Sequence, residues 1–350
     1  MCNNLIIVNQ HARWGRSRHR IRRSQRILSQ QGFPFSPVTT EHPGHACELA
    51  RKACAQNVDT IIVLGGDGTV NEVVNGILNS ECHHMPRSVS ENPVVGPRAS
   101  DFSTGKDGEA GDIGVYRRCS RTQSSRKTNR SKPDRILRPA PRLGIIPTGS
   151  SNDFSRSLGI PQRLRQACQT VVRGKTKQVD VGQAGQHYFC MASCVGLLAD
   201  IAATSMDMRG LLGSIRYIAA ALKVVKTMSR GWDMRIKADK LDRAREYAGL
   251  LVSNTERFGG LTMMPQAKPD DGLLDCLLVE MVSKREALAL VPLALRQALE
   301  RHPKVTRFQA RSLSLSLDRP TRLCNDGEVY GESFQKIEYR LLPQKLAVIC

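Results

Sequence analysis

The residues best suited to chemistry lie in one stretch, residues 63–76. Three of the four residues 65–68 are glycine, so the backbone can approach a ligand closely because no Cβ intervenes. Asp67 places a carboxylate inside this turn, and Thr69 adds a hydroxyl. A glycine turn that opens a helix directs free N–H groups and the positive end of the helix dipole at one point, which favours a phosphate. A carboxylate beside such a cradle indicates Mg²⁺-dependent phosphoryl transfer. The structural alternative is a plain tight turn.

A strand and a helix must position this turn. Residues 60–64 form an apolar, partly β-branched run of strand length. From Val70 onward, apolar residues recur with the i, i+3, i+4, i+7, i+8 spacing of a helix that buries one face. They are Val70, Val73, Val74, Ile77 and Leu78. The pattern therefore predicts strand, glycine turn and helix in that order.

The whole stretch resembles the nucleotide-binding motif of the diacylglycerol kinase catalytic-domain family, which includes bacterial lipid kinases and the sphingosine and ceramide kinases. The resemblance implies that ATP phosphates lie on residues 65–69 and that Mg²⁺ bridges them near Asp67. The residues expected to bind the nucleotide here are Gly65, Gly66, Asp67, Gly68, Thr69, Val70 and Asn71.

The first strand is followed by a second segment that resembles this family. Residues 5–8 read as a buried strand, and Asn9 matches the start of the family's Asn-Pro-x-x-Gly loop. Gln10 replaces the proline, and the glycine comes late, at Gly15, so the contacts of this loop are in question. Seven arginines follow between residues 13 and 26. They indicate either a solvated helix face or a surface that faces phosphate or membrane.

Two hydroxyl side chains complete the expected nucleotide contacts. Thr40, between a predicted strand over residues 33–39 and a helix over 46–55, matches a threonine that contacts the nucleotide in the family. Residues 147–154 follow a strand over 143–146 and resemble the Gly-Thr-x-Asn-Asp-Phe motif, with Ser150 keeping the hydroxyl. Helix capping and a capped turn are the structural alternatives. Turns at the ends of neighbouring strands favour a shared cleft.

Two clusters of carboxylates lie in the second half of the chain. Residues 265–275 form an acid-rich turn that resembles the family's Asp-Asp-Gly-Leu-Leu-Asp segment. The resemblance implies a structural Mg²⁺ held by the Asp271 carboxylate and the carbonyls of Lys268 and Leu273. Residues 325–328 resemble the Asp-Gly-Glu motif, which makes Glu328 the proton acceptor with Asp326 beside it. Asp67 is the competing base, and a hairpin turn is the structural alternative.

The chain divides into three expected parts. For residues 1–158 we expect an α/β nucleotide-binding domain with a parallel sheet. A basic, disordered insertion at residues 83–142 interrupts this domain. Residues 159–334 predict a β-rich, sandwich-like lipid-substrate domain, and residues 335–350 return to the first domain. Short strands are expected at 178–181, 187–194, 232–238, 247–254, 273–281 and 312–317. One helix, 211–228, interrupts them, either as core or as a basic amphipathic helix near a lipid-accepting cleft.

Composition limits the compartment and the partners. Lysine and arginine total 52 against 32 acidic residues, which gives a formal net charge of +20 and suits a polyanion. The eleven cysteines include no Cys-x-x-Cys pair, as is typical of a reducing compartment. No secretory signal and no apolar run of roughly 20 residues is visible. We therefore expect a cytoplasmic protein with peripheral contact to an anionic membrane.

The prediction as a whole is an ATP-dependent lipid kinase that uses ATP and Mg²⁺ and phosphorylates the hydroxyl of diacylglycerol or a related lipid. An NAD kinase shares the glycine turn and is one alternative. A lipid- or nucleotide-binding protein without catalysis is another, because the Asn9 loop departs from the family pattern. The positive charge also suits a nucleic-acid binder, but no recognition module is present, so no specific nucleic acid is expected. The sequence is compatible with a homodimer and does not determine the oligomeric state.

Overall fold

The computed structural model describes residues 3–10, 18–80, 139–208, 214–239 and 241–350 of the chain, with the backbone alone at 331–333. Residues 83–138 of the predicted insertion therefore lie outside the described residues. The arginines at positions 13 and 16 lie outside them as well. The sheet resumes at Arg142, which the sequence pattern had assigned to the insertion. No helix of the described segments is long and apolar enough to span a membrane.

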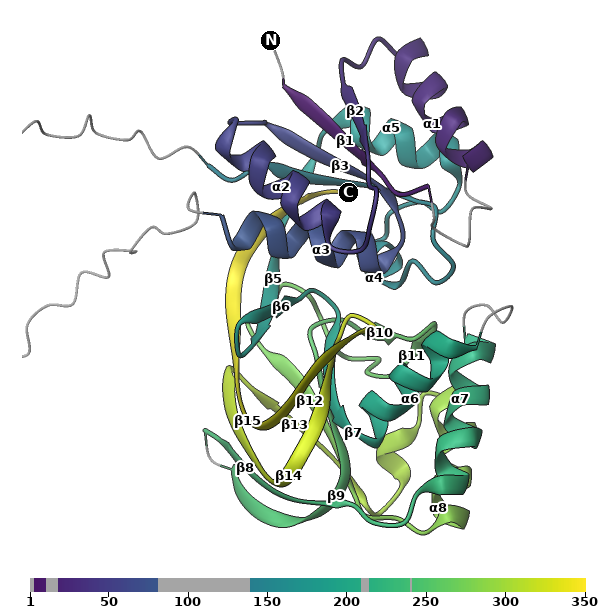
Figure 1. Cartoon of the computed structure of the whole chain (residues 1–350), viewed down its shortest axis with the longest axis vertical. Helices are drawn as coiled ribbons and strands as arrows, with labels where there is room; N and C mark the ends of the chain where they lie inside the picture. Colours follow the sequence, from purple (N-terminus) through teal and green to yellow (C-terminus); the bar gives the residue numbers. More distant parts are fainter. Residues whose placement is uncertain (1–2, 11–17, 81–138, 209–213, 240) are drawn as a thin grey trace, which may run out of the picture. The chain divides into compact units, whose positions relative to one another are not determined.

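The N-terminal domain is built on a parallel sheet (Figure 1). Its strands are β1 (Asn4–Val8), β2 (Ser36–Thr39), β3 (Thr60–Gly65) and β4 (Arg142–Pro147). They pair in parallel in the order β2-β1-β3-β4. The second strand is shorter than predicted: the Phe33 N–H donates to the Leu28 carbonyl of the preceding helix, and pairing with β1 begins at Ser36.

Helices cover both faces of this sheet, because successive strand residues point to opposite sides. Ile7, Val63 and Ile145 face α2 (His45–Ala55) and α3 (Asp67–Leu78). Ile6, Ile62 and Leu64 face α1 (Arg18–Gln30) and α5 (Leu164–Arg173). Strands buried on both faces need the near-continuous apolar runs that the sequence shows. The fold thereby brings the carboxyl ends of the parallel strands, and the turns after them, to one edge.

The second domain is an antiparallel β structure, and the last strand joins it to the first. Its strands are β5 (Thr176–Ala184), β6 (His187–Phe189), β7 (Ala192–Gly196), β8 (Trp232–Ala238), β9 (Leu241–Ser253), β12 (Leu274–Glu280), β13 (Val305–Ala310), β14 (Ser312–Asn325) and β15 (Glu328–Ile349). Strand β15 pairs antiparallel with β14 and β5, and Val348 pairs in parallel with Leu143 of β4. The predicted fold class, an α/β domain plus a β-rich sandwich-like domain, is confirmed.

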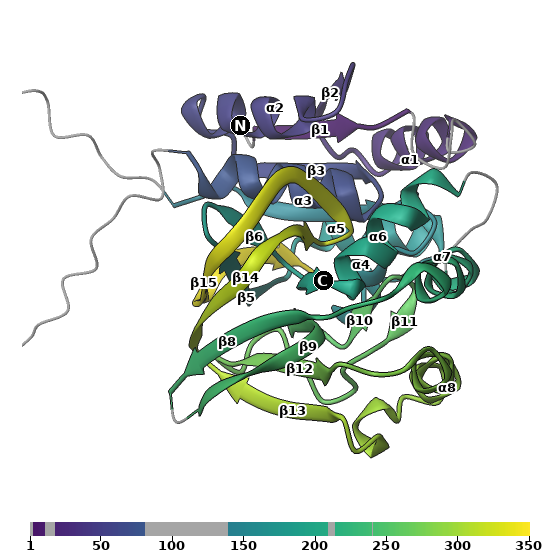
Figure 2. The ribbon, with the colours of Figure 1, turned by 60° about the horizontal axis from the view of Figure 1, so that its bottom comes forward.

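The prediction of a single helix in the second domain is wrong. Three helices, α6 (Leu197–Asp207), α7 (Ser214–Thr227) and α8 (Lys284–Leu295), gather on one side of the sheet (Figure 2), and a 3₁₀ turn (Leu299–Arg301) follows α8. Helix α7 is the one predicted, described from Ser214. Helix α8 begins with a capping box between Ser283 and Glu286, a signal that was available in the sequence. Pro292 lies inside α8, where proline is normally unfavourable.

The predicted run 187–194 is two strands rather than one. It breaks at Cys190 and Met191, whose N–H groups turn away from the strand ladder and donate to the Asp326 carboxylate. A tertiary contact therefore decides this boundary, and no local pattern could predict it.

Candidate active site

The predicted glycine turn is the first turn of α3. The helix begins at Asp67, three residues earlier than the apolar spacing indicated, with Gly66 as N-cap. The first amides of a helix have no intrahelical partner, so this end can donate hydrogen bonds to an anion. A Cβ on Gly149 would lie 2.5 Å from the Gly66 Cα, so the turns after β3 and β4 pack together only because both residues are glycine.

Asn9 and Thr69 meet at one wall of this site. The Asn9 side-chain amide donates to the Thr69 hydroxyl at 2.9 Å, and the Asn9 N–H donates to the Leu64 carbonyl at 3.0 Å. Both residues line a polar cleft of about 240 Å³, together with Gly66, Asp67, Gly68 and Ser150. The altered loop after β1 therefore still delivers its asparagine to the cleft, although residues 11–17 lie outside the described part of the chain.

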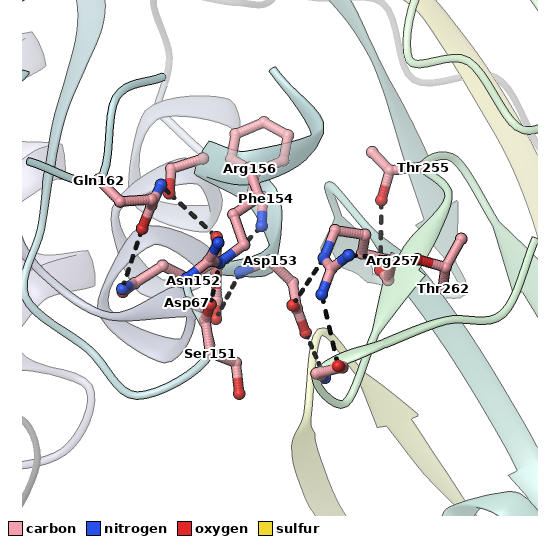
Figure 3. A network of polar contacts seen from close by, with 12 residues as sticks. Asp67, Ser151, Asn152, Asp153, Phe154, Arg156, Gln162, Thr255, Arg257 and Thr262 are labelled. Atoms are coloured by element: carbon pink, nitrogen blue, oxygen red, sulfur yellow. Dashed lines mark hydrogen bonds and ion pairs between the residues drawn. The ribbon is translucent and has the colours of Figure 1, made fainter. Parts of the chain in front are cut away.

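Asp67 binds the start of the short helix α4 (Asp153–Ser157). Its two carboxylate oxygens accept the N–H groups of Asp153 and Phe154 at 3.1 and 3.2 Å (Figure 3). Burial, and next the neighbouring Asp153 carboxylate, raise the pKa of Asp67 to about 7, while the two amides oppose the rise. The sequence pattern connected this carboxylate with Mg²⁺ alone, whereas two backbone amides already stabilise its charge.

Asp153 continues this contact into the second domain. Its carboxylate accepts the Gly260 N–H at 2.6 Å and forms an ion pair with Arg257 at 3.3 Å (Figure 3). Gly260 lies in the hairpin between β10 (Arg257–Phe258) and β11 (Leu261–Thr262). The glycine turn is thus connected, through Asp67, α4 and Asp153, to a hairpin of the other domain.

Glu328 lies directly against the glycine turn, 260 residues away in the sequence. A Cβ added to Gly68 would collide with the Oε1 atom of Glu328, so Gly68 leaves the space that this carboxylate occupies. Glu328 is exposed as a residue, although the walls of the cleft enclose part of its carboxylate. Burial raises the pKa of Glu328, the carboxylates of Glu72 and Asp326 raise it further, and Arg216 opposes them.

Asp326 is held on every side by donors. Its carboxylate accepts the N–H groups of Cys190, Met191 and Ala192 at 2.7, 2.8 and 3.0 Å, and the Asn71 amide at 2.8 Å. Both central residues of this β14–β15 turn, Asp326 and Gly327, have positive φ, as a two-residue primed hairpin requires. The turn is therefore both the hairpin and the support that points Glu328 at the cleft.

Four of the predicted nucleotide contacts do not line the cleft. Gly65 and Val70 are buried, and the Thr40 hydroxyl lies 3.4 Å from the Val8 carbonyl. Asn71 is also buried, and its amide donates to the Tyr188 carbonyl as well as to Asp326. Through these two hydrogen bonds, Asn71 joins α3 to the second domain.

The acid-rich turn at 268–275 lies away from the cleft and is well partnered. Asp270 pairs with Lys177 at 3.0 Å, and the buried Asp275 pairs with Arg307 at 2.6 Å. Asp180 accepts the Gly272 N–H at 2.8 Å.

Asp271 is exposed and accepts only the Leu273 N–H at 3.1 Å in the contacts described. Burial, and next the nearby Asp275, Asp180 and Asp270, raise the pKa of Asp271. Since the other three carboxylates already have partners, a hard cation there would rest on the Asp271 carboxylate and on backbone carbonyls.

The cleft also contains residues that the sequence patterns did not single out. Glu72, Arg216, Tyr217 and Phe258 all line it. The Arg216 guanidinium lies 5.5 Å from the centre of the Tyr217 ring, and its buried Nε has no hydrogen-bond partner within the described part of the chain. The leucine-glycine segment before Arg216 carries no chemical signature, so only the fold could place this cation opposite Glu328.

An apolar cavity of about 140 Å³ adjoins the polar cleft. It lies between the inner faces of α6, α7 and α8 and the strands beneath them. Tyr217 and Phe258 line both spaces, with ring centres 6.1 Å apart, and so form the partition between them. The molecule therefore places an apolar cavity next to a polar cleft that contains the start of α3.

The residues of the cleft fit a magnesium ion only together with a bound phosphate. Among the described residues, no group of three or more His, Cys, Asp or Glu side chains could hold a metal alone. Mg²⁺ usually takes one or two protein carboxylates, with substrate phosphates and water completing its shell. The hard oxygen donors of Asp67, next to the phosphate-favouring end of α3, match that requirement.

Comparison with known proteins agrees with this architecture. The chain is 28% identical to a diacylglycerol kinase of Staphylococcus saprophyticus over 87% of its own length and 82% of the relative's. It is 27% identical to a diacylglycerol kinase of Staphylococcus aureus over 87% of its length and 79% of that protein's. The crystal structure of a diacylglycerol kinase from Bacillus anthracis, 21% identical, has the same fold, with a TM-score of 0.65 and coverage of 99% and 96% of the two chains.

Two family matches divide the chain between them. Residues 3–93 and 126–184 match the diacylglycerol kinase catalytic domain, and residues 192–350 match the YegS C-terminal NAD kinase β sandwich-like domain. This chain belongs to the diacylglycerol kinase catalytic-domain family.

Proposed function

We propose that this member of a kinase family is an ATP-dependent lipid kinase that transfers the γ-phosphoryl group of ATP to a lipid hydroxyl, with diacylglycerol or a related lipid as acceptor. One observation carries the proposal: the partition of Tyr217 and Phe258 separates a polar cleft, which holds a glycine turn and an acid, from an apolar cavity. A hydroxyl that reaches the cleft from a chain held in the cavity would meet the base and the phosphate together.

The principal residues of the cleft have different roles in this reaction. The amides at the start of α3 bind the phosphates of ATP, and Asn9, Thr69 and Ser150 line the same wall. Glu328 accepts the proton of the lipid hydroxyl, because its raised pKa brings it nearer to the operating pH than that of an ordinary glutamate. The pKa of Asp67 is raised as well, to about 7, but Asp67 is less suited to be the base because both of its oxygens already accept amides of α4.

Asp326 acts as a positioning residue in the proposed reaction. Both of its carboxylate oxygens accept hydrogen bonds from the four donors, so it holds the turn before Glu328 in place.

Arg216 faces the same cleft and is suited to neutralise phosphate charge. When bound, Mg²⁺ neutralises the charge that develops on the transferred group, and Asp67 would hold it. A second Mg²⁺ fits the structural role at Asp271, with the carbonyls of Lys268 and Leu273. Rate then comes from positioning and charge stabilisation, not covalent chemistry by the protein.

The test is a phosphorylation assay with γ-labelled ATP and a panel of acceptors. The panel includes diacylglycerol, phosphatidylglycerol, a sphingoid base and NAD, with the wild-type protein and Glu328→Gln. Label in one of the lipids, absent from NAD and lost in the variant, supports the proposal and names the substrate. Label in NAD alone would replace it with the NAD kinase alternative. No label in any acceptor, with ATP still bound, would favour a binding protein without catalysis.

A further inference from the structure

Large exposed hydrophobic side chains are concentrated on one part of the surface. Six such side chains occur in the described residues, and five lie on α6, α7 and α8: Met206, Ile215, Leu222, Leu288 and Leu295. The sixth, Val172, lies on α5 of the other domain. The five residues thus belong to the same three helices that enclose the apolar cavity.

Helix α8 is apolar on both of its faces. Its inner face contributes Ala287, Leu290, Val291 and Ala294 to the wall of the cavity. Its outer face exposes Leu288, Ala289, Pro292 and Leu295, which follow the i, i+1, i+4, i+7 spacing of one helical stripe. A helix that is apolar all round is normally buried. The outer stripe of α8 therefore lacks a covering partner among the described residues.

Basic side chains frame this apolar surface. Lys223 and Lys226 are exposed on α7, which carries no acidic residue. Lys284, Arg285 and Arg296 are exposed at the two ends of α8. The one acid of α8, Glu286, binds Lys304 at 3.0 Å and accepts the Ser283 N–H at 2.7 Å. An apolar stripe with a cationic frame is complementary to a surface that is hydrocarbon below and anionic above.

We propose that the outer faces of α7 and α8, defined by Ile215, Leu222, Leu288, Leu295 and the five basic residues around them, dock on an anionic lipid bilayer. The inference rests on the proposed function and deepens it by naming where the lipid enters. In this pose the helices lie at the interface with the apolar cavity directly behind them. A lipid chain then moves between α7 and α8 into the cavity without crossing water, and its hydroxyl end reaches the partition at Tyr217.

Binding to vesicles tests the docking surface without any chemistry. Purified full-length chain is sedimented with phosphatidylcholine vesicles, with or without phosphatidylglycerol, in the absence of ATP. We expect binding to the anionic vesicles, and a drop of at least tenfold in the partition coefficient for the double variant Leu288→Ser and Leu295→Ser. Val172→Ser removes an exposed hydrophobic side chain on the other domain, 36% exposed against 46% for Leu288 and 52% for Leu295, and should bind as the wild type does.

A second set of variants tests the contribution of charge to vesicle binding. Arg285→Glu with Arg296→Glu should weaken binding to anionic vesicles more than binding to neutral ones, and added salt should weaken wild-type binding. Arg165→Glu with Arg173→Glu, exposed positions on α5, is the matched control. If the α5 variants lose as much binding as the α8 variants, attraction is general to this basic chain and the docking surface is overturned.

The outcomes separate docking from catalysis. Wild-type binding by the Leu288→Ser and Leu295→Ser variant would overturn the docking surface and leave the kinase proposal standing. Binding that depends on these residues, in a protein that phosphorylates no lipid, would leave docking standing and remove the proposed reaction. A concentration-dependent dimer that the leucine variant abolishes, with no vesicle binding by the wild type, would assign the stripe to a second copy and overturn docking.

Discussion

The polar cleft and the apolar cavity share a wall but are built by different means. The cleft collects side chains from the ends of β1, β3 and β4, from α7 and from the β14–β15 turn, so its members are up to 319 residues apart, from Asn9 to Glu328. The cavity draws on one continuous region, from Leu197 to Leu299. The cleft depends on directional hydrogen bonds with specific partners. The cavity depends on the shape and volume left between packed helices.

This difference teaches what each space tolerates. A hydrogen bond or charge in the cleft is lost entirely when its partner is replaced, because the remaining group is left unpaired. Apolar packing is non-directional, so the cavity should tolerate exchanges that conserve volume. Substitutions in the cleft should therefore change the reaction, and substitutions in the cavity should change which lipid is accepted.

The largest effect is expected from Glu328→Gln. It keeps the size of the side chain but removes the base, so kcat should fall by roughly 10² to 10⁴-fold, the usual contribution of general base catalysis. Steady-state kinetics with saturating ATP and lipid measure it. Glu300→Gln, on the exposed 3₁₀ turn, is a control for the loss of a negative charge. A fall of less than tenfold would move the base to another residue, with Asp67 the first candidate.

Asp326→Asn should damage stability as well as activity. The amide group of asparagine would present a donor to N–H groups that now donate to a carboxylate, which leaves a buried donor unsatisfied. The expected cost is about 2 to 4 kcal/mol in the free energy of unfolding. Urea denaturation measures that free energy. An unchanged midpoint with reduced kcat would mean that Asp326 acts on the substrate directly and not through the turn.

Filling the apolar cavity should separate its role from that of the cleft. Ala294→Phe on the inner face of α8 occupies space that a lipid chain would use. We expect kcat/KM for a long-chain lipid to fall about tenfold relative to a short-chain analogue, because the loss of a single methylene contact in an apolar pocket costs about that much. The KM for ATP should not change. Equal losses for both lipids would show that chain length is read elsewhere.

The smallest effect is a shift in the pH profile. The Arg216 cation favours the ionised form of Glu328, so its removal in Arg216→Leu should raise the pKa of this carboxyl further. Catalysis needs the ionised form, and the acid limb of kcat/KM should therefore move to higher pH. A profile between pH 4 and pH 9 measures the shift. A limb that moves to lower pH would contradict the assigned direction.

The sequence patterns predicted local elements well and long-range contacts poorly. The strand before the glycine turn and the helix after it follow from β-branched residues and helical spacing within residues 60–78. The Asp-Gly pair at 326–327 predicts a tight hairpin for the same local reason. Helix α6 was missed because its short apolar run carries no boundary signal, and the assignment of Asn71 to the nucleotide ignored a buried partner on the other domain.

By itself the sequence determined the local chemistry: a glycine turn suited to phosphate, carboxylates near glycines, and strands with buried faces. These features depend on neighbours within a few residues, and covalent geometry sets them. Only the tertiary structure decided that Glu328 rests on Gly68, that Arg216 faces it, and that an apolar cavity lies behind Tyr217. Those contacts join segments far apart in the chain, and they require the two domains to be held together, as β15 does by pairing with β14 and β5 and with β4.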